Sequence, residues 1–460
     1  MKRIHFVLFI VFLLATCKKD ENIFPPSTGI DFNHISINDT LTIPLQTKVQ
    51  FLVYSAHEDL TYIWDFGDST GSQVKIDTHS YAKRGLYKVS VAAHKGDKES
   101  ESNFFVRVVG QVIGKKSDKP EGIAVLEYNS EVYVFNKKLY TDTLFLHHLR
   151  EYHEMISKNI SLHDAWECYD FEKDNGNNIV CLLSGSFLKF DLAGSMVANV
   201  SQDHSALQND YLKAHIFPST DNNYVLTRID SYKAVFNKLN ESCQNILHQD
   251  LYDNENSAKK CLDAVATSNT EYLLLLNNFF ANDYPNDTAN LSISISKRNI
   301  ENGNEINLDF PKVYYNTILS VNDGFIIYGF DLETSCLGCE SYLNIVKISS
   351  DIKIEWQKKI DLGPKFYDGQ PYTDKILVRE YDDRYLLFLN DEFYTIDKTG
   401  SVSQPKSFFA VFQFHINSVC NSGVNTLILG TVNYSDLHDS SADETYPILF
   451  KIDKEGNIID

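Results

Sequence analysis

Two aspartates, Asp65 and Asp68, lie three residues apart in the segment TYIWDFGDSTGSQ of residues 61–73. Carboxylates at this spacing are residue types that general acid–base catalysis uses. Short Asp side chains beside Gly and Ser also accept hydrogen bonds from the backbone N–H groups of a turn. A catalytic pair would need a cleft and perturbed pKa values, and the sequence implies neither. We therefore expect both aspartates to stabilise a turn.

A histidine-rich segment and two acidic segments contain residue types that bind metal ions. The segment HHLREYHEM lacks the H-E-x-x-H order of a zinc protease, and both acidic segments lack the spacing of a calcium loop. The residues are His147, His148, Glu151, His153 and Glu154 in the first segment, Asp170, Glu172 and Asp174 in the second, and Asp436, Asp439, Asp443 and Glu444 in the third. We expect a solvated connection at the histidines, solvated hairpin tips at the acids, and no metal site.

Cys336 and Cys339 have the spacing of half a zinc site or of a redox dithiol. No second Cys pair or His pair supplies the remaining zinc ligands, and no alternation of strands and helices surrounds the pair. We expect a local disulfide in this loop. The sequence also lacks nucleophile-elbow, P-loop and dinucleotide-binding motifs, so we expect no catalytic residues and no cofactor.

The first 17 residues have the pattern of an export signal. Lys2 and Arg3 precede an apolar run that is too short to span a bilayer, and the run ends at Leu14-Ala15-Thr16-Cys17. This order resembles the lipobox of bacterial lipoproteins, which implies that Cys17 is lipidated; an ordinary signal peptide is the alternative. We expect an outer-membrane lipoprotein, exposed at the cell surface or, alternatively, facing the periplasm. Residues 18–28 then form a polar tether.

The composition excludes one class of partner and favours strands. The chain has 62 acidic and 42 basic residues, a net charge of −20, so it would repel a nucleic-acid backbone. It also contains 26 Tyr and 29 Phe but few Met, and aromatic side chains pack well on pleated sheets. We expect an all-β protein that does not bind nucleic acid.

Residues 29–109 contain several short strands with alternating apolar residues, typical of a β-sandwich. The segment WDFGDS and the strand after it resemble the polycystic kidney disease (PKD) domain, an immunoglobulin-like sandwich. The matching residues are Trp64, Asp65, Phe66, Gly67, Asp68, His79, Tyr81, Gly85, Tyr87, Val89 and Val91. The resemblance implies a structural role for this motif.

Residues 110–460 repeat a unit of two apolar strands that ends in a K-x-D or N-K-x turn. First strands begin near Ile123, Ile179, Tyr224, Tyr272, Phe325, Tyr385 and Thr426. Strand repeats about 50 residues long are typical of β-propellers, and the last copy resembles bacterial propeller repeats in Lys451, Asp453, Gly456 and Asn457. We expect seven blades, with six or eight as alternatives.

These observations predict a membrane-anchored, non-catalytic binding or scaffold protein whose ligand is a glycan or a protein. The PKD-like domain would be a spacer or adhesive module, and the propeller the binding platform. One alternative is a hydrolase or lyase of extracellular polysaccharide, with carboxylates from several blades meeting in the channel. Another is a structural partner in an outer-membrane complex.

Overall fold

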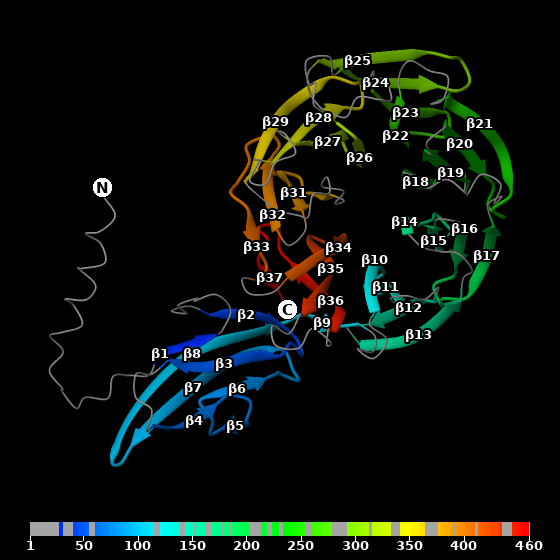
Figure 1. The fold of residues 1–460 in the computed structure, drawn as a ribbon. Helices are drawn as coiled ribbons and strands as arrows, with labels where there is room; N and C mark the ends of the chain where they lie inside the picture. Colours follow the sequence, from blue (N-terminus) through cyan, green and yellow to red (C-terminus); the bar gives the residue numbers. More distant parts are fainter. Residues whose placement is uncertain are drawn as a thin grey trace, which may run out of the picture. The chain divides into compact units, whose positions relative to one another are not determined.

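The structure is a computed structural model in which the chain forms two compact units, residues Met1–Val109 and Gly110–Asp460 (Figure 1). Each unit is described by itself. The structure describes residues 27–30, 40–54, 60–113, 120–138, 143–150, 153–161, 168–176, 178–183, 186–201, 213–218, 223–229, 233–253, 260–277, 292–311, 315–332, 341–363, 376–389, 392–409, 413–434 and 444–459.

The first unit is a sandwich of two sheets. One sheet has the order β1 (Ser27–Ile30), β3 (Val49–Tyr54), β6 (Ile76–His79). The other has the order β2 (Leu41–Pro44), β8 (Lys98–Val109), β7 (Gly85–Lys95), β4 (Thr61–Asp65), β5 (Gly71–Ser72).

Aromatic side chains fill the space between the two sheets of the sandwich. The ring of Phe51 on β3 lies 5.9 Å from that of Trp64, 5.2 Å from that of Phe66 and 6.0 Å from that of Phe104. All four side chains are buried. The alternation of apolar residues in the sequence therefore faces the core as predicted.

The strands described in the second unit form seven sheets arranged as a ring (Figure 1); each contains four consecutive strands, and the last has β9 (Gln111–Val112) as a fifth strand. The first three sheets are β10 (Pro120–Tyr128), β11 (Glu131–Lys138), β12 (Thr143–Arg150), β13 (His153–Ser161); β14 (Cys168–Lys173), β15 (Ile179–Leu183), β16 (Ser186–Phe190), β17 (Met196–Ser201); and β18 (Lys213–Pro218), β19 (Tyr224–Ile229), β20 (Lys233–Leu239), β21 (Asn245–Asp253).

The other four sheets continue around the ring in chain order. They are β22 (Lys260–Ala266), β23 (Glu271–Asn277), β24 (Ser292–Asn299), β25 (Glu305–Pro311); β26 (Thr317–Val321), β27 (Gly324–Leu332), β28 (Ser341–Ser349), β29 (Ile354–Gly363); β30 (Leu377–Glu380), β31 (Arg384–Leu389), β32 (Glu392–Asp397), β33 (Lys406–Ser407); and β34 (Gln413–Ser422), β35 (Asn425–Tyr434), β36 (Glu444–Ile452), β37 (Ile458–Ile459). The prediction of an all-β protein with a sandwich and a propeller-like domain is confirmed.

The two ends of the second unit meet in its last sheet. Strand β9 (Gln111–Val112) pairs with β36 at Ile448 and Leu449, and β37 from the C-terminal end pairs with the same strand at Lys451 and Ile452. The innermost strands of neighbouring sheets also contact one another in the order β30, β34, β10, β14, β18, β22, β26. The first and last sheets are therefore in contact at their innermost strands, and the last sheet contains strands from both ends of the unit.

The turn between the third and fourth strands has the same chemistry in six sheets. A side-chain oxygen of its first residue accepts backbone N–H groups inside the turn; these first residues are Asp191, Asn240, Asn299, Ser349, Asp397 and Asp453. A later turn residue has positive φ, in four sheets a glycine and in the other two Cys243 and Ile352. The K-x-D turn of the repeat is thus an Asx turn followed by a left-handed residue.

The first sequence repeat is displaced by one strand relative to the others. Ile123 lies on β10, the innermost strand of its sheet, whereas the other repeats begin on second strands, as Ile179 does on β15. The first sequence repeat therefore covers β10 and β11, whereas each later repeat covers the second and third strands of its sheet. Within the described residues no helix is long and apolar enough to cross a membrane.

Candidate functional site

Two cavities lie along the centre of the ring, with volumes of about 290 and 430 Å³. The first is lined by β14, β18, β22 and β26 and the second by β10, β14, β30 and β34. Together they touch the innermost strand of each sheet described. Asp170 and Glu172 on β14 line both cavities, so we treat the two as one central channel.

The channel wall is mainly apolar or uncharged. Its larger apolar residues are Ile123, Leu126, Phe217, Leu319 and Leu377, and its uncharged polar residues include Ser320, Asn417, Ser418 and Asn421. Its ionisable residues other than Cys420 are Glu127, Asp170, Glu172 and His215. In the described part of the chain no Lys or Arg lines either cavity.

Side-chain oxygens on the innermost strands accept backbone N–H groups of the next sheet. Asp170 Oδ2 accepts the N–H of Ile216 at 2.7 Å. Asp263 Oδ2 accepts that of Ile318 at 2.7 Å, and Ser418 Oγ that of Val125 at 3.1 Å. Each acceptor follows a β-bulge in its strand, which turns the side chain toward the neighbouring sheet. These contacts join adjacent sheets around the channel.

Asp263 is the centre of a buried polar cluster that joins three sheets. Its carboxylate lies 2.9 Å from His215 Nε2 and 3.9 Å from Lys213 Nζ, and it also accepts the backbone N–H of Ala264. Lys213 in turn donates to Asn316 O and to the hydroxyl of Thr317. Because the Asp263 carboxylate accepts three hydrogen bonds, from His215, Ala264 and Ile318, and pairs with Lys213, the cluster is a structural contact between sheets.

The charges in this cluster shift one another's pKa values. Burial acts to raise the pKa of Asp263, but Lys213 and His215 outweigh it and hold that pKa below its usual value. Burial acts to lower the pKa of His215, and the Asp263 carboxylate reverses this and raises it. Burial lowers the pKa of Lys213. The cluster is therefore an ion pair of Asp263 with its neighbours.

Neither Cys420 in the channel wall nor Cys261 beside Asp263 has an activated thiol. Burial raises the pKa of Cys261 and, to about 12, that of Cys420. A thiol with a raised pKa stays protonated and is inert. His215 is committed to Asp263 rather than to a hydroxyl or thiol. The arrangement required for nucleophilic catalysis is thus not formed by these described residues.

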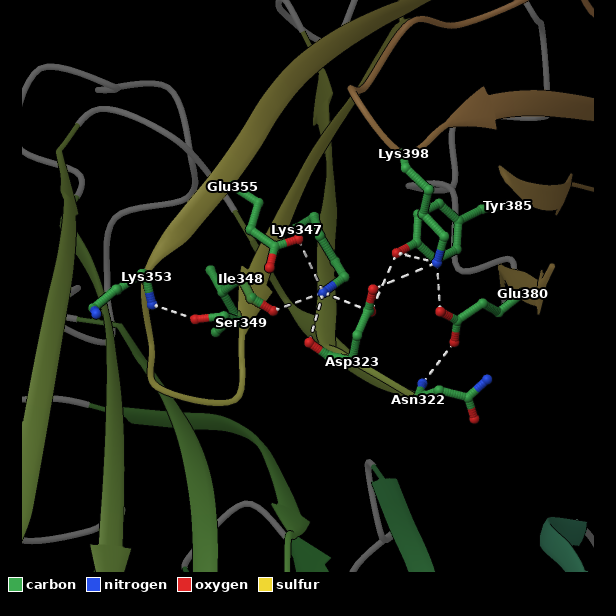
Figure 2. A network of polar contacts seen from close by, with 10 residues as sticks. All are labelled: Asn322, Asp323, Lys347, Ile348, Ser349, Lys353, Glu355, Glu380, Tyr385 and Lys398. Carbon is green, nitrogen blue, oxygen red and sulfur yellow. Dashed lines mark hydrogen bonds and ion pairs between the residues drawn. The ribbon is translucent and has the colours of Figure 1, made fainter. Parts of the chain in front are cut away.

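A second polar network joins the sheet β26–β29 to the sheet β30–β33 (Figure 2). Lys347 on β28 is fully buried, and its Nζ lies 2.9 Å from Asp323 Oδ1 and 3.3 Å from Glu355 Oε2. Across the boundary, Lys398 Nζ contacts Glu380 Oε1 at 2.5 Å and Asp323 Oδ2 at 3.5 Å. The Asp323 carboxylate therefore lies between two ammonium groups from different sheets.

Three further contacts belong to this network. Tyr385 donates its hydroxyl to Asp323 Oδ1 at 3.3 Å, and Lys398 lies 4.1 Å from the centre of the Tyr385 ring. The backbone N–H of Asn322 donates to Glu380 Oε2 at 2.6 Å. Burial raises the pKa of Tyr385 to about 12, so its hydroxyl is a hydrogen-bond donor and not a base. The network is a bridge between two sheets.

The Lys of the sequence repeat forms the same kind of ion pair in other sheets. Lys189 lies 3.4 Å from Asp174, and Lys297 lies 3.3 Å from Glu271. In each case an acidic residue in the hairpin between the first and second strands contacts a Lys on the third strand. The repeated Lys is thus explained by stability and not by ligand binding.

In the first unit, Asp65 and Asp68 cap the turn after β4. Asp65 Oδ1 accepts the N–H of Gly67 at 2.8 Å, and Asp68 Oδ1 accepts the N–H of Thr70 at 3.1 Å. Asp68 Oδ2 also contacts His79 Nε2 at 2.9 Å. Burial acts to raise the pKa of Asp68, but the hydrogen bonds of Thr70 and His79 lower it. A carboxylate held ionised by its own turn is a structural group.

The other residues of the PKD-like motif pack around this turn. Gly67 has a φ of 79°, and a Cβ atom there would lie 2.5 Å from Lys88 O. Tyr81 donates to Phe66 O at 3.1 Å, and its ring stacks on that of Tyr87. Trp64 donates its indole N–H to Val74 O at 2.9 Å. Gly85 begins β7.

The prediction that the histidine-rich segment connects the first two blades is wrong. Its described residues lie on β12 and β13, which pair within the first sheet, and Glu151 lies outside the described residues. His148 Nε2 donates to Glu131 Oε2 at 2.7 Å and its ring stacks on that of Tyr133, and His147 is buried. No group of three metal-ligating side chains forms among the described residues.

The prediction of solvated tips is also wrong for one acidic segment. Asp170 and Glu172 lie on a strand and line the channel. Asp174 is buried and accepts the hydroxyl of Tyr224 at 2.6 Å. The residues of the other predicted sites lie outside the described residues, namely Cys17, Cys336, Cys339, Asp436, Asp439 and Asp443.

Sequence reasoning missed Lys213, His215 and Asp263. Their contacts join strands about 50 residues apart, which no local motif reveals. One signal was available: Asp263 is a lone acid inside the apolar strand KCLDAVA. A buried charge needs a partner, so this position could have been singled out.

A scan of protein families matches residues 34–108 to the PKD domain. No curated protein matches the chain. The WD40 domain of Pan2 from Neurospora crassa is 7% identical with a TM-score of 0.45, over 74% of this chain and 93% of that chain. An extracellular domain of a putative one component system from B. thetaiotaomicron is 10% identical with a TM-score of 0.46, over 89% and 52%. The PKD domain of human SorCS2 is 23% identical with a TM-score of 0.17, over 20% and 77%.

Proposed function

We propose that the chain is a surface-anchored lipoprotein that binds a glycan or protein ligand without catalysis. The ligand occupies the central channel, and the PKD domain is a spacer between the membrane and the ring. One observation carries the proposal: the channel is lined by the innermost strands of the seven sheets described, while Asp170 and His215 in its wall are committed to contacts between sheets.

The chemistry of the channel favours binding over catalysis. Asp170 and Asp263 accept backbone N–H groups of neighbouring sheets. Their replacement would therefore disturb the ring itself, whereas a catalytic carboxylate must be free to exchange a proton. The polysaccharide hydrolase or lyase receives no support from these groups.

A binding screen followed by a channel-filling variant tests the proposal. Residues 18–460 are screened on a glycan array and used to capture proteins from cell extracts. Ser320→Trp places an indole in the channel, where Ser320 lines the wall, and should abolish binding of the ligand found. Val424→Trp is the matched control, because Val424 lies in a turn with its side chain 81% exposed.

Two outcomes would contradict the proposal. Full binding by Ser320→Trp would place the ligand outside the channel. Cleavage of a polymer by the purified chain would show an enzyme, which no binding role requires.

A further inference from the structure

The larger sheet of the PKD sandwich has one face that turns away from the sandwich core. Along β4, β7 and β8 alternate residues are buried, as Trp64 and Val106 are, and the residues between them form the other face. We call this the outer face; it comprises Thr61, Ile63, Asp65, Leu86, Lys88, Ser90, Ala92, His94, Glu99, Glu101, Asn103, Phe105 and Arg107. Its Ile63, Leu86 and Phe105 side chains are 47%, 61% and 43% exposed. Exposed apolar side chains on one face mark a candidate interaction surface.

Opposite charges lie at the two ends of the outer face. The register of β4, β7 and β8 arranges its residues in rows that cross the strands. In order, the rows are Thr61, His94 and Glu99; Ile63, Ala92 and Glu101; Asp65, Ser90 and Asn103; Lys88 and Phe105; and Leu86 and Arg107. The carboxylates lie in the first three rows, and Lys88 and Arg107 lie in the last two. The face is therefore acidic at one end and basic at the other.

This order of charges makes the outer face complementary to a second copy of itself turned end for end. A two-fold axis that crosses the strands at the middle row brings the row of Lys88 in each copy onto the row of Glu101 in the other. The Lys88 ammonium then lies near the Glu101 carboxylate of the other copy, and Phe105 packs on Ala92. Sheets that pack face to face interdigitate their side chains in this way. Two-fold interfaces are the commonest in homo-oligomers.

The two charged side chains of this contact are available for it. Lys88 and Glu101 are exposed, and within the described part of the chain neither side chain forms an ion pair. They lie two rows apart on one copy, about 13 Å along the strands, so they do not neutralise each other. A partner with charge of one sign would be repelled at one end of the face, because like charges at an interface are unfavourable. A second copy matches both ends.

We propose that two copies of the chain associate through the outer face of the PKD domain, around a two-fold axis at the row of Ser90. This association goes beyond the proposed function, because it concerns the PKD domain and not the channel. The rows cover about 27 Å by 14 Å on three strands, which is less than the area of about 800 Å² per partner in a standard interface. The dimer is therefore weak, with a dissociation constant between about 1 µM and 1 mM.

The test measures self-association of residues 18–460, which contain every strand described, by sedimentation equilibrium at up to about 300 µM. The wild type should form a dimer. Lys88→Glu and Glu101→Lys each create two like-charge pairs in the dimer and should weaken it about tenfold. An equal mixture of the two variants contains both ion pairs again and should regain the wild-type affinity. Lys358→Glu makes the same change at an exposed residue of the ring and should have no effect.

Recovery in the mixture is the decisive result, because variants that had lost their fold would not regain a dimer on mixing. The double variant Lys88→Glu/Glu101→Lys reverses both charges in one chain, and its dimer should be as strong as that of the wild type. A wild type that stays monomeric at the highest concentration overturns the proposal. So does an unchanged affinity in Lys88→Glu, a mixture that associates no better than its components, or an assembly larger than a dimer.

Discussion

Removing the Asp323 carboxylate should destabilise the ring more than removing the Lys that it neutralises. In Asp323→Ala the fully buried ammonium of Lys347 keeps Glu355 at 3.3 Å and two carbonyl oxygens at 3.1 Å. Lys398 and Tyr385 lose a partner as well. Hydrogen bonds to charged groups contribute about 1.5–3 kcal/mol. Because Asp323 is half exposed, we expect the free energy of unfolding to fall by about 2 kcal/mol, near the lower end of this range.

Lys347→Met should lower the free energy of unfolding much less than Asp323→Ala does. The variant removes the buried charge and keeps a side chain of similar length. The carboxylates left behind, Asp323 and Glu355, are 50% and 39% exposed and can be hydrated. Replacing a buried ion by an apolar group of similar size is often neutral, so we expect a change within about 1 kcal/mol. The double variant should then be more stable than Asp323→Ala.

Calorimetric unfolding measures these differences, and we expect separate transitions for the ring and the PKD domain because each is a compact unit. For a unit the length of the ring, about 2 kcal/mol corresponds to a shift of about 3 °C in Tm. A double variant less stable than Asp323→Ala would refute the reasoning. It would mean that Lys347 stabilises the ring without its carboxylate.

The pH dependence provides a second check on Asp323. Burial acts to raise its pKa, but Lys347 and Lys398 lower it below the usual 3.8. A carboxylate with a depressed pKa stabilises the folded state above its unfolded pKa, and this contribution is lost as the pH falls through the folded value. The difference between wild type and Asp323→Ala should therefore be constant from pH 7 to 5 and shrink below about pH 4.

Three further predictions concern other parts of the chain. Gly456→Ala puts a Cβ atom 2.2 Å from Phe393 Cζ at a φ of 83° and should lower the free energy of unfolding by about 2–4 kcal/mol. Gly303→Ala is the control, because Gly303 has a φ of 69° with open space around it, and it should lower that free energy by about 1–2 kcal/mol. Equal losses in the two variants would show that the contact with Phe393 does not contribute. Asp68→Ala should lower the Tm of the PKD domain and leave ligand binding intact, since a loss of binding would give this turn a functional role. Cys17→Ala should release the chain from the membrane fraction, and retention there would overturn the lipoprotein proposal.

The repeat was predictable from sequence because its chemistry is local. Asp453 and Gly456 act within one turn, where a carboxylate accepts N–H groups two and four residues ahead and a glycine takes positive φ. The sequence spacing therefore contains the whole interaction. The first repeat was misplaced for the same reason: the strand of Ile123 has the right local pattern, and only pairing in the sheet shows that it is innermost.

The channel was not predictable, because its contacts join different sheets. Asp170 and Ile216 are 46 residues apart, and Asp263 and Ile318 are 55. The length of each interval depends on connections whose lengths vary from sheet to sheet. A motif of fixed spacing cannot describe such a contact.

A recurring local pattern nevertheless marks these positions. Cys168-Tyr-Asp170 and Cys261-Leu-Asp263 each place an Asp two residues after a Cys, at the bulge of an innermost strand. In the last sheet Ser418 has the same role toward Val125 with no negative charge. A neutral hydroxyl thus suffices to join two sheets. The charge of Asp170 is therefore not needed for its hydrogen bond to the next sheet, whereas the charge of Asp263 is balanced by Lys213 and His215 within its own cluster.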